Sequence, residues 1–252
     1  MPPDPPSRIG LPLILFALLL VGLVNLAALT NWNGGVLRGE LVDSDGYLRM
    51  MRVLELREGS PWFEDLTTRL APPEGLVIQW TRPLDLLILL PGLALEWLGG
   101  FAPRQALLIA GIAISPILLV GAALAAAWGA RAIWPGRAPW YAVLLMVGSP
   151  SAATYSALGR PDHHALIILL LALALGATLR AVLPGGTRRA AIGAGIAFGT
   201  AIWVGPEALI VAVPTLAALG LAALIAADGR ALARQGWRLG LGMAGTFVLA
   251  ML

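Results

Sequence analysis

The sequence predicts an all-α polytopic membrane protein. Of its 252 residues, 58% are hydrophobic and only 12% are charged, and the mean hydropathy of +0.82 is far above that of a soluble domain. Apolar runs of about 20 residues, the length that crosses a hydrocarbon core roughly 30 Å thick, follow one another along the chain. Composition and run length therefore favour several transmembrane helices.

Seven apolar segments are predicted to span the bilayer, and the first is expected to be retained rather than cleaved. They are residues 11–30, 104–128, 140–158, 165–183, 190–204, 207–227 and 239–252. Residues 83–98 form a shorter run that carries Asp85 and Glu96, so an interfacial or re-entrant helix is expected there. Together these elements predict a single transmembrane domain over residues 1–252.

The arginines predict the orientation, because basic residues collect in cytoplasmic loops. They group near residues 131–137, 180–189 and 230–238, in loops that alternate with arginine-poor ones. The N-terminus is therefore expected in the cytoplasm, with a large first outer loop, residues 31–103, on the other side. Since all basic residues are arginine and the chain is rich in Ala and Gly, we expect the cytoplasmic (inner) membrane of a prokaryote.

Within that outer loop, residues 45–58 are predicted to form an amphipathic helix, because apolar residues recur at helical spacing. If the helix lies on the membrane surface, Arg49, Arg52 and Arg57 are able to reach lipid phosphates. The alternative is a helix packed inside the loop.

Composition also excludes some classes of chemistry. The chain has no cysteine, so neither disulfides nor thiolate metal ligands are available, and metal binding has to use carboxylate, imidazole or amide groups. The net charge of +3 resides in loop arginines and indicates no nucleic-acid partner.

The Asp-His-His triplet at residues 162–164 is the strongest indication of function. It lies between two long apolar runs at the predicted start of a helix, where Asp162 and His164 can point into one cavity. A carboxylate with an imidazole suits Mn²⁺ or Mg²⁺ and leaves coordination positions open for substrate oxygens. The alternative is structural: Asp162 caps the helix and the histidines sit at the membrane interface.

Further acids are predicted on the same outer side. Asp43 and Asp45 either cap the amphipathic helix or, with Asp162 and His164, help to bind a cation that neutralises a pyrophosphate leaving group. Glu207, in a turn between two predicted spans, is either a further site residue or the N-cap of the next helix.

Five features, in chain order, resemble the catalytic subunit of oligosaccharyltransferases, a family of GT-C glycosyltransferases that use sugars linked to lipid pyrophosphates. They are the single N-terminal span, Asp-Ser-Asp-Gly-Tyr at 43–47, the Pro-Glu-Gly, Trp and Pro-Leu-Asp residues within 73–85, Gly-Arg-Pro-Asp-His-His at 159–164, and Trp-Val-Gly at 203–205. The Asp-His-His form is most similar to that of archaeal members. The resemblance covers the whole chain and implies a GT-C-like helical bundle with a large first outer loop containing amphipathic helices.

The resemblance also implies an activity: transfer of a sugar or oligosaccharide from a polyprenyl (di)phosphate donor to asparagine in a protein acceptor. Asp45 would be catalytic, contacting both the acceptor and a bound Mn²⁺ or Mg²⁺, and Asp162 and His164 would complete the metal site. The residues expected to contact the donor phosphates are His163, Arg82 and Arg160. The expected partners are the lipid-linked donor, the acceptor and the bilayer.

Departures from the family pattern leave alternatives open. The chain stops inside an apolar run at Leu252, and neither the later outer-loop Thr-x-x-Glu motif nor the C-terminal soluble domain with its Trp-Trp-Asp motif is expected within residues 1–252. One alternative is a truncated, non-catalytic homologue that binds polyprenyl phosphate or a partner subunit. The other is a GT-C enzyme that acts on lipid or polymer acceptors.

Overall fold

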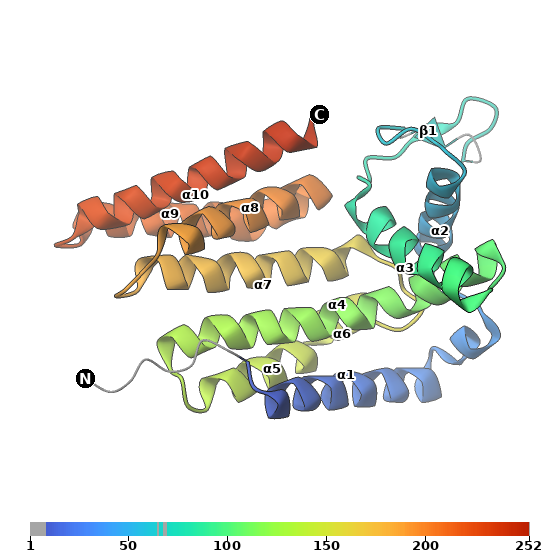
Figure 1. The fold of residues 1–252 in the computed structure, drawn as a ribbon, viewed down its shortest axis with the longest axis horizontal. Helices are drawn as coiled ribbons and strands as arrows, with labels where there is room; N and C mark the ends of the chain where they lie inside the picture. The colour runs from blue at the N-terminus through green and yellow to red at the C-terminus, as the bar shows by residue number, and fades with distance from the viewer. Residues whose placement is uncertain (1–8, 65, 68–69, 252) are drawn as a thin grey trace.

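The computed structural model describes residues 9–64, 66–67 and 70–251, and these are largely helical. Long helices lie side by side in one bundle (Figure 1). The segment between the helices Leu11–Asn31 and Pro103–Ile133 lies across one end of this bundle. The elements are α1 (Leu11–Asn31), the 3-10 helix η1 (Gly34–Arg38), α2 (Ser44–Arg57), β1 (Leu66–Thr67), β2 (Leu76–Val77), α3 (Pro83–Gly99), α4 (Pro103–Ile133), α5 (Ala138–Gly148), α6 (Pro150–Tyr155), α7 (His163–Val182), α8 (Arg188–Val204), η2 (Pro206–Ala208), α9 (Leu209–Ile225) and α10 (Gly229–Ala250). The two strands pair antiparallel.

Within the described residues, four helical segments are long and apolar enough to cross a membrane: Leu11–Asn31, Pro103–Ile133, His163–Val182 and Pro206–Ile225. They confirm the predicted all-α polytopic membrane fold. The other predicted spans coincide with α5 and α6, with α8 and with α10, which are helical but shorter or less apolar. Whether these also cross the bilayer, and whether α3 is interfacial or re-entrant, stay predictions.

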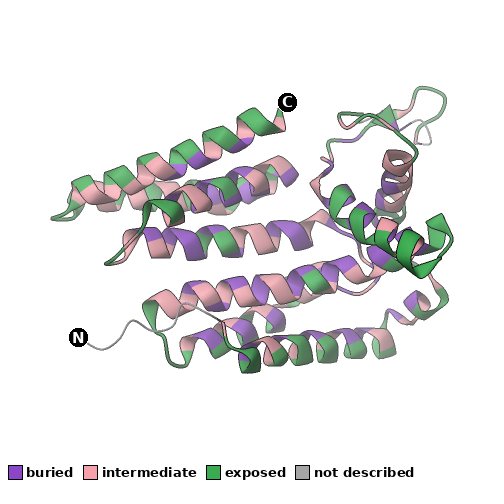
Figure 2. Ribbon diagram, viewed as in Figure 1, coloured by how far each residue is buried: buried purple, intermediate pink, exposed green. Residues whose placement is uncertain are grey.

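Buried residues lie on the helix faces that meet inside the bundle (Figure 2). Many of the buried residues are alanines, whereas many large apolar side chains are exposed, as a lipid environment allows. A side chain on Gly129 of α4 would lie 2.8 Å from the Cα of Gly176 in α7, so these helices touch at backbone level. Similarly, a side chain on Gly195 of α8 would collide with the Leu239 carbonyl of α10. Glycine is required at these crossings because any larger residue would push the helices apart.

The predicted span 140–158 is not continuous. The helix ends at Gly148, and a new short helix, α6, starts at Pro150. Proline has no N–H to continue the hydrogen-bond ladder, whereas it fits the first turn of a helix, and Ser149 caps that turn by accepting a hydrogen bond from the Ala152 N–H. The segment predicted as a span is therefore two helices that meet at the Ser-Pro pair.

The amphipathic helix forms as predicted, as α2, but its arginines do not face lipid. Arg49 and Arg52 are 1% and 2% exposed and, with Arg82, surround the fully buried Asp85 of α3. We call these four residues the Asp85 cluster. The distances to the Asp85 carboxylate are 2.7 Å from Arg49 Nη1, 3.1 Å from Arg82 Nη1 and 3.7 Å from Arg52 Nε. Arg57 forms a bidentate pair with Glu96, also in α3.

The expectation that Arg49, Arg52 and Arg57 reach lipid phosphates was therefore wrong, and the alternative of a packed loop helix is the one observed. The periodicity of α2 indicated an amphipathic helix but not what its polar face contacts. Since Asp85 and Glu96 lie on the next helix, the arginines of α2 pair within the protein.

The two ends of the bundle differ in charge. The acidic end is the one formed by the α1–α4 segment, the α6–α7 loop and the α8–α9 turn, and it holds the described acids apart from Asp228. The arginine end, formed by the α4–α5, α7–α8 and α9–α10 loops, holds Asp228 and most of the exposed arginines. This asymmetry agrees with the predicted orientation, which itself stays a prediction.

Candidate functional site

The loop before α7 is fixed by a proline in the middle of α4. Pro116 has no N–H, so the Ile112 carbonyl one turn earlier lacks its helical partner, and the Gly159 N–H donates to it at 2.9 Å. The Ser115 hydroxyl donates to the Arg160 carbonyl and accepts from the Asp162 N–H. A break in the α4 ladder therefore anchors the backbone of the Gly-Arg-Pro-Asp segment.

The same loop is tied to the chain that follows α1. Asn25, buried in α1, accepts a hydrogen bond from the Leu158 N–H at 2.7 Å, and the Val42 N–H donates to the Gly159 carbonyl at 3.0 Å. Gly159 has φ +79°, and a side chain there would strike Val36. The structure thereby brings the Asp-Ser-Asp and Asp-His-His segments, far apart in sequence, to one place.

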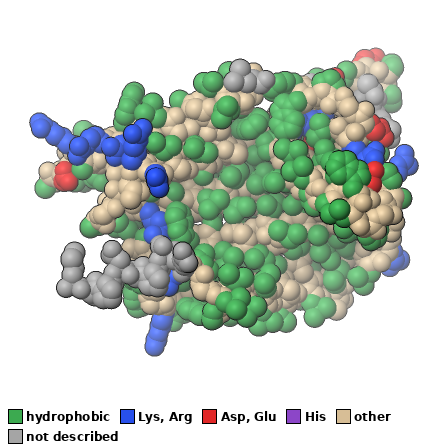
Figure 3. All heavy atoms as spheres, in the orientation of Figure 1, with side chains coloured by type: hydrophobic (Ala, Val, Ile, Leu, Met, Phe, Trp, Pro, Cys, Tyr) green, Lys and Arg blue, Asp and Glu red, His purple; other side chains and the backbone are tan. Residues whose placement is uncertain are grey.

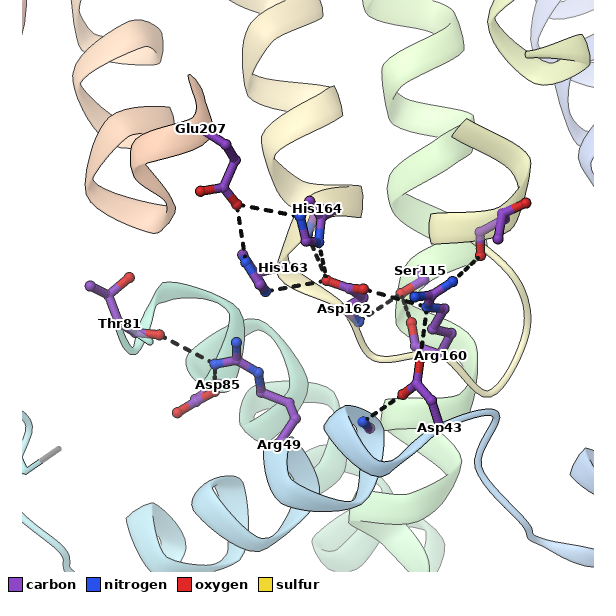
Figure 4. Close-up of polar contacts among 12 residues, drawn as sticks. Asp43, Arg49, Thr81, Asp85, Ser115, Arg160, Asp162, His163, His164 and Glu207 are labelled. Atoms are coloured by element: carbon purple, nitrogen blue, oxygen red, sulfur yellow. Dashed lines mark hydrogen bonds and ion pairs between the residues drawn. The ribbon is translucent and has the colours of Figure 1, made fainter. Parts of the chain in front are cut away.

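Two imidazoles lie between two carboxylates at this point (Figure 4). His163 Nδ1 and His164 Nδ1 lie 3.2 Å and 2.7 Å from Asp162 Oδ1. Their Nε2 atoms lie 3.2 Å and 3.4 Å from Glu207 Oε1. We call these four residues the histidine–carboxylate cluster; it joins the start of α7 to the turn between α8 and α9.

Asp162 has two roles in this geometry. Its Oδ1 accepts the His164 N–H at 3.0 Å and so caps α7, as the structural alternative supposed. Burial raises the pKa of Asp162, but hydrogen bonds from the side chains of His163 and His164 and from the His164 backbone outweigh it and hold that pKa well below its usual range. Asp162 is therefore an ionised carboxylate at neutral pH as well as a cap.

Arg160 links the cluster to the second acidic segment. Its Nε lies 3.0 Å from Asp43 Oδ2 and 3.4 Å from Asp162 Oδ2, and its guanidinium lies 4.7 Å from the centre of the Tyr155 ring. Asp43 also caps α2 by accepting from the Gly46 N–H. With neutral histidines, the three carboxylates of Asp43, Asp162 and Glu207 and this one guanidinium leave two negative charges, which suits a divalent cation.

The ligand atoms of Asp162, His163 and His164 all lie within 4.8 Å of one another. Carboxylate and imidazole donors at this separation fit Mn²⁺ or Mg²⁺. Asp45 is not in this group: it is exposed in the first turn of α2. The adjacent Gly46 packs against the loop, since a side chain there would lie 3.2 Å from Pro161 Cδ. The proposed role of Asp45 as a metal ligand stays a prediction.

Arg82, predicted to contact donor phosphates, lies in the Asp85 cluster and is 2% exposed. It lines a cavity of about 170 Å³ together with Arg52 and three tryptophans, Trp62, Trp80 and Trp203. The Trp80 ring lies 5.7 Å from the His163 ring, so this aromatic cavity adjoins the histidine–carboxylate cluster. The contact of Arg82 with a donor stays a prediction.

Sequence reasoning missed several supporting residues. Tyr155 stacks on His164 at 4.3 Å, and Ser115, Pro116 and Asn25 position the loop. A proline and an asparagine within apolar spans were the available signals, because such residues need partners inside a membrane. The interpretation of Glu207 as an N-cap was wrong: the cap position of α9 is Ala208, and the Glu207 carboxylate faces the histidines.

No protein-family model and no curated protein matches the sequence. Among solved structures, the apo crystal structure of the oligosaccharyltransferase from Archaeoglobus fulgidus is similar, with a TM-score of 0.72 and 20% sequence identity. The match covers 94% of this chain and 29% of that one. The chain therefore has the fold of part of an archaeal oligosaccharyltransferase and spans less than a third of its length.

Proposed function

We propose that this chain is the membrane portion of a glycosyltransferase that moves a sugar or oligosaccharide from a polyprenyl (di)phosphate donor to an acceptor. The observation that carries the proposal is the histidine–carboxylate cluster, in which Asp162 and Glu207 hold two imidazoles between them at the acidic end of an oligosaccharyltransferase-like fold. A buried helix cap alone would not need a second carboxylate from another turn.

A Mn²⁺ or Mg²⁺ ion would be held by Asp162 and His164 with His163, and by Asp45 as the predicted further ligand. When bound, it would neutralise the charge that develops on the departing diphosphate. Arg160 is held beside Asp162 by two ion pairs and presents a guanidinium suited to a phosphate oxygen. Arg82 and His163 are the other proposed donor contacts.

The α2 N-terminus supplies the acceptor side in this proposal. Asp45 is exposed there and would orient the acceptor group, which is an asparagine amide if the likeness to the archaeal enzyme extends to its acceptor. The cavity between Trp62, Trp80 and Trp203 would offer aromatic faces to the donor sugar. Each group needed for transfer would then lie at the acidic end, which we place on the outer side of a prokaryotic cytoplasmic membrane.

The first test is Mn²⁺ binding to the purified chain in detergent, since binding does not require the rest of a longer enzyme. We expect wild type to bind Mn²⁺, Asp162→Asn to lose binding and Asp45→Asn to bind more weakly. Asp228→Asn, which removes an acid from the arginine end, is the matched control. Equal binding by Asp162→Asn and Asp228→Asn would contradict the metal site.

The second test separates transfer from binding. Wild-type protein is given a short polyprenyl diphosphate sugar and an asparagine-containing peptide, and both glycopeptide and free polyprenyl diphosphate are measured. Glycopeptide formed by wild type and not by Asp162→Asn supports the transferase. Donor binding without turnover would instead support the non-catalytic homologue, and sugar transferred to lipid rather than peptide would support the GT-C alternative.

A further inference from the structure

Four aromatic rings form a continuous row through the histidine–carboxylate cluster. The centre of the Trp80 ring lies 5.7 Å from the centre of the His163 ring, and the His163 and His164 rings lie 4.3 Å apart. Next in the row, the Tyr155 ring stacks on His164 at 4.3 Å, with 25° between the two ring planes. At these separations each ring packs against its neighbour. We call these four residues the ring row.

An arginine lies over the ring at each end of the row. The Arg49 guanidinium lies 4.5 Å from the centre of the Trp80 ring. The Arg160 guanidinium lies 4.7 Å from the centre of the Tyr155 ring. A guanidinium over an aromatic face is attracted by the negative charge of that face, so both outer rings are held from the outside as well as by their neighbours.

The two arginines are themselves fixed by carboxylates. Arg49 Nη1 lies 2.7 Å from Asp85 Oδ1, in a pair that is closed to solvent. Arg160 Nε lies 3.0 Å from Asp43 Oδ2 and 3.4 Å from Asp162 Oδ2. The ring row is therefore enclosed between two anchored cations, and the Asp85 cluster supports one end of it.

Separate segments of the chain supply the rings. Trp80 lies in the loop before α3, Tyr155 is the last residue of α6, and the histidines begin α7. The loop that carries Trp80 is tied to α2, because Arg52 Nη2 donates to the Trp80 carbonyl at 2.9 Å. The outer rings thus meet the histidines from two elements that are independent of α7.

The polar contacts of the two imidazoles do not fix the planes of their rings. In both histidines Nδ1 faces Asp162 Oδ1 and Nε2 faces Glu207 Oε1, so the contacts hold two atoms of each ring. A ring held at two atoms is still able to rock about the line that joins them. A neutral imidazole also has one N–H, and it donates to one of the two carboxylates at a time. Packing against the ring faces removes this freedom.

We propose that Trp80 and Tyr155 are positioning residues that hold the rings of His163 and His164 in the planes needed for metal ligation. This inference rests on the metal site of the proposed function. An imidazole binds a metal ion through a lone pair in the plane of its ring, so a ring that rocks turns the lone pair away from the ion. Loss of a group that orients a metal ligand lowers metal affinity by about 10–100-fold.

The first readout needs no metal. The chain contains only two histidines, so ¹³C-labelled histidine gives nuclear magnetic resonance signals from the ring row alone. We expect two narrow Cε1–Hε1 signals from the metal-free wild type in detergent. In Trp80→Leu and Tyr155→Leu these signals should broaden through ring motion, because leucine offers no flat face to an imidazole. Tyr155→Phe keeps the ring face and should keep both signals narrow.

The second readout is Mn²⁺ affinity. We expect it to fall about tenfold in Trp80→Leu and in Tyr155→Leu, and to stay close to wild type in Tyr155→Phe. The control is Trp128→Leu, because the Arg180 guanidinium also lies 4.5 Å from the centre of the Trp128 ring. That pair lies at the arginine end, where arginine side chains gather away from most acidic ones (Figure 3). Trp128→Leu should change neither readout.

The outcomes separate this inference from the proposed function. Wild type that binds no Mn²⁺ would contradict the metal site, and the metal-free signals would still decide whether the rings are held. Unchanged Mn²⁺ affinity in both leucine variants would overturn the positioning role and leave the metal site intact. Narrow histidine signals in both leucine variants, with the fold intact by circular dichroism, would also overturn it. So would equal effects in Trp128→Leu, or a loss that Tyr155→Phe does not restore.

Discussion

Two ionic clusters lie near each other at the acidic end, and they differ in solvent exposure and in the sign of the surplus charge. The Asp85 cluster is closed to solvent, with side chains 0–2% exposed, whereas His164 and Glu207 of the histidine–carboxylate cluster are each 34% exposed. The first has three cations around one carboxylate, and the second has carboxylates around two titratable rings. Accessibility and sign of charge therefore separate structural support from candidate chemistry.

The guanidinium groups of the Asp85 cluster also donate hydrogen bonds to backbone carbonyls. Arg49 donates to the Thr81 carbonyl and Arg52 to the Trp80 carbonyl. Arg82 donates to the carbonyls of Arg52 and Glu64. These bonds tie α2 and the loop before α3 together. In the histidine–carboxylate cluster, by contrast, Arg160 pairs with Asp162, and the Glu207 carboxylate faces the two imidazoles.

The largest expected effect is on stability and comes from Asp85→Asn. This change leaves three buried guanidiniums without their carboxylate, and removal of one partner from a buried ion pair costs about 3–5 kcal/mol. We expect a clear drop in the midpoint of thermal or denaturant unfolding in detergent. An Asp85→Asn protein as stable as wild type would show that the cluster is not a structural support.

The converse effect is expected from Asp162→Asn. Asparagine caps a helix about as well as aspartate but removes the charge that pairs with Arg160, so the free energy of unfolding should fall by less than in Asp85→Asn. Mn²⁺ affinity should fall by at least about tenfold, because a charged ligand is lost. The comparison would break if this variant unfolded as readily as Asp85→Asn while it still bound Mn²⁺.

A smaller effect is expected from Pro116→Ala. The new N–H competes with Gly159 for the Ile112 carbonyl, which loosens the loop that carries Asp162. The loss of one loop hydrogen bond is worth about 1 kcal/mol, or roughly fivefold in Mn²⁺ affinity. The matched control is Pro91→Ala in α3, the helix that contains Asp85; it should leave Mn²⁺ affinity unchanged.

The smallest effect is expected from Arg57→Gln. Its pair with Glu96 is partly exposed, at 26% and 18%, unlike the arginines around Asp85. Exposed pairs contribute little to stability and are screened by salt. The unfolding midpoint should shift far less than in Asp85→Asn, and the shift should shrink in high salt. A loss comparable to that of Asp85→Asn would show that burial does not separate the two pairs.

The sequence predicted the structure well where a pattern of residues has one usual structural or chemical role. Apolar runs predicted the helices, and the Asp-His-His triplet marked the loop that carries the cluster. It was uninformative where the partner of a residue lies far along the chain. Nothing local indicated that Asp85 would draw Arg49 and Arg52 inward, or that Glu207 would turn back to the histidines instead of capping α9.

The geometry of the loop before α7 could not be predicted from the sequence either. Pro116 looked like one more residue of an apolar span, and its consequence, a free Ile112 carbonyl, matters only because Gly159 lies beside it in three dimensions. Asp45, predicted to share the metal site, is exposed in the first turn of α2. Its chemical role depends on a ligand and stays a prediction.

The most direct test of the account is pulsed electron paramagnetic resonance on Mn²⁺ added to the purified chain. Imidazole ligation couples the Mn²⁺ electron spin to ¹⁴N nuclei, so the histidine–carboxylate cluster predicts a ¹⁴N coupling in wild type and in Arg57→Gln that disappears in His163→Gln/His164→Gln. Mn²⁺ bound without ¹⁴N coupling in wild type, or a coupling that survives loss of both histidines, would contradict the claim that this cluster is the metal site.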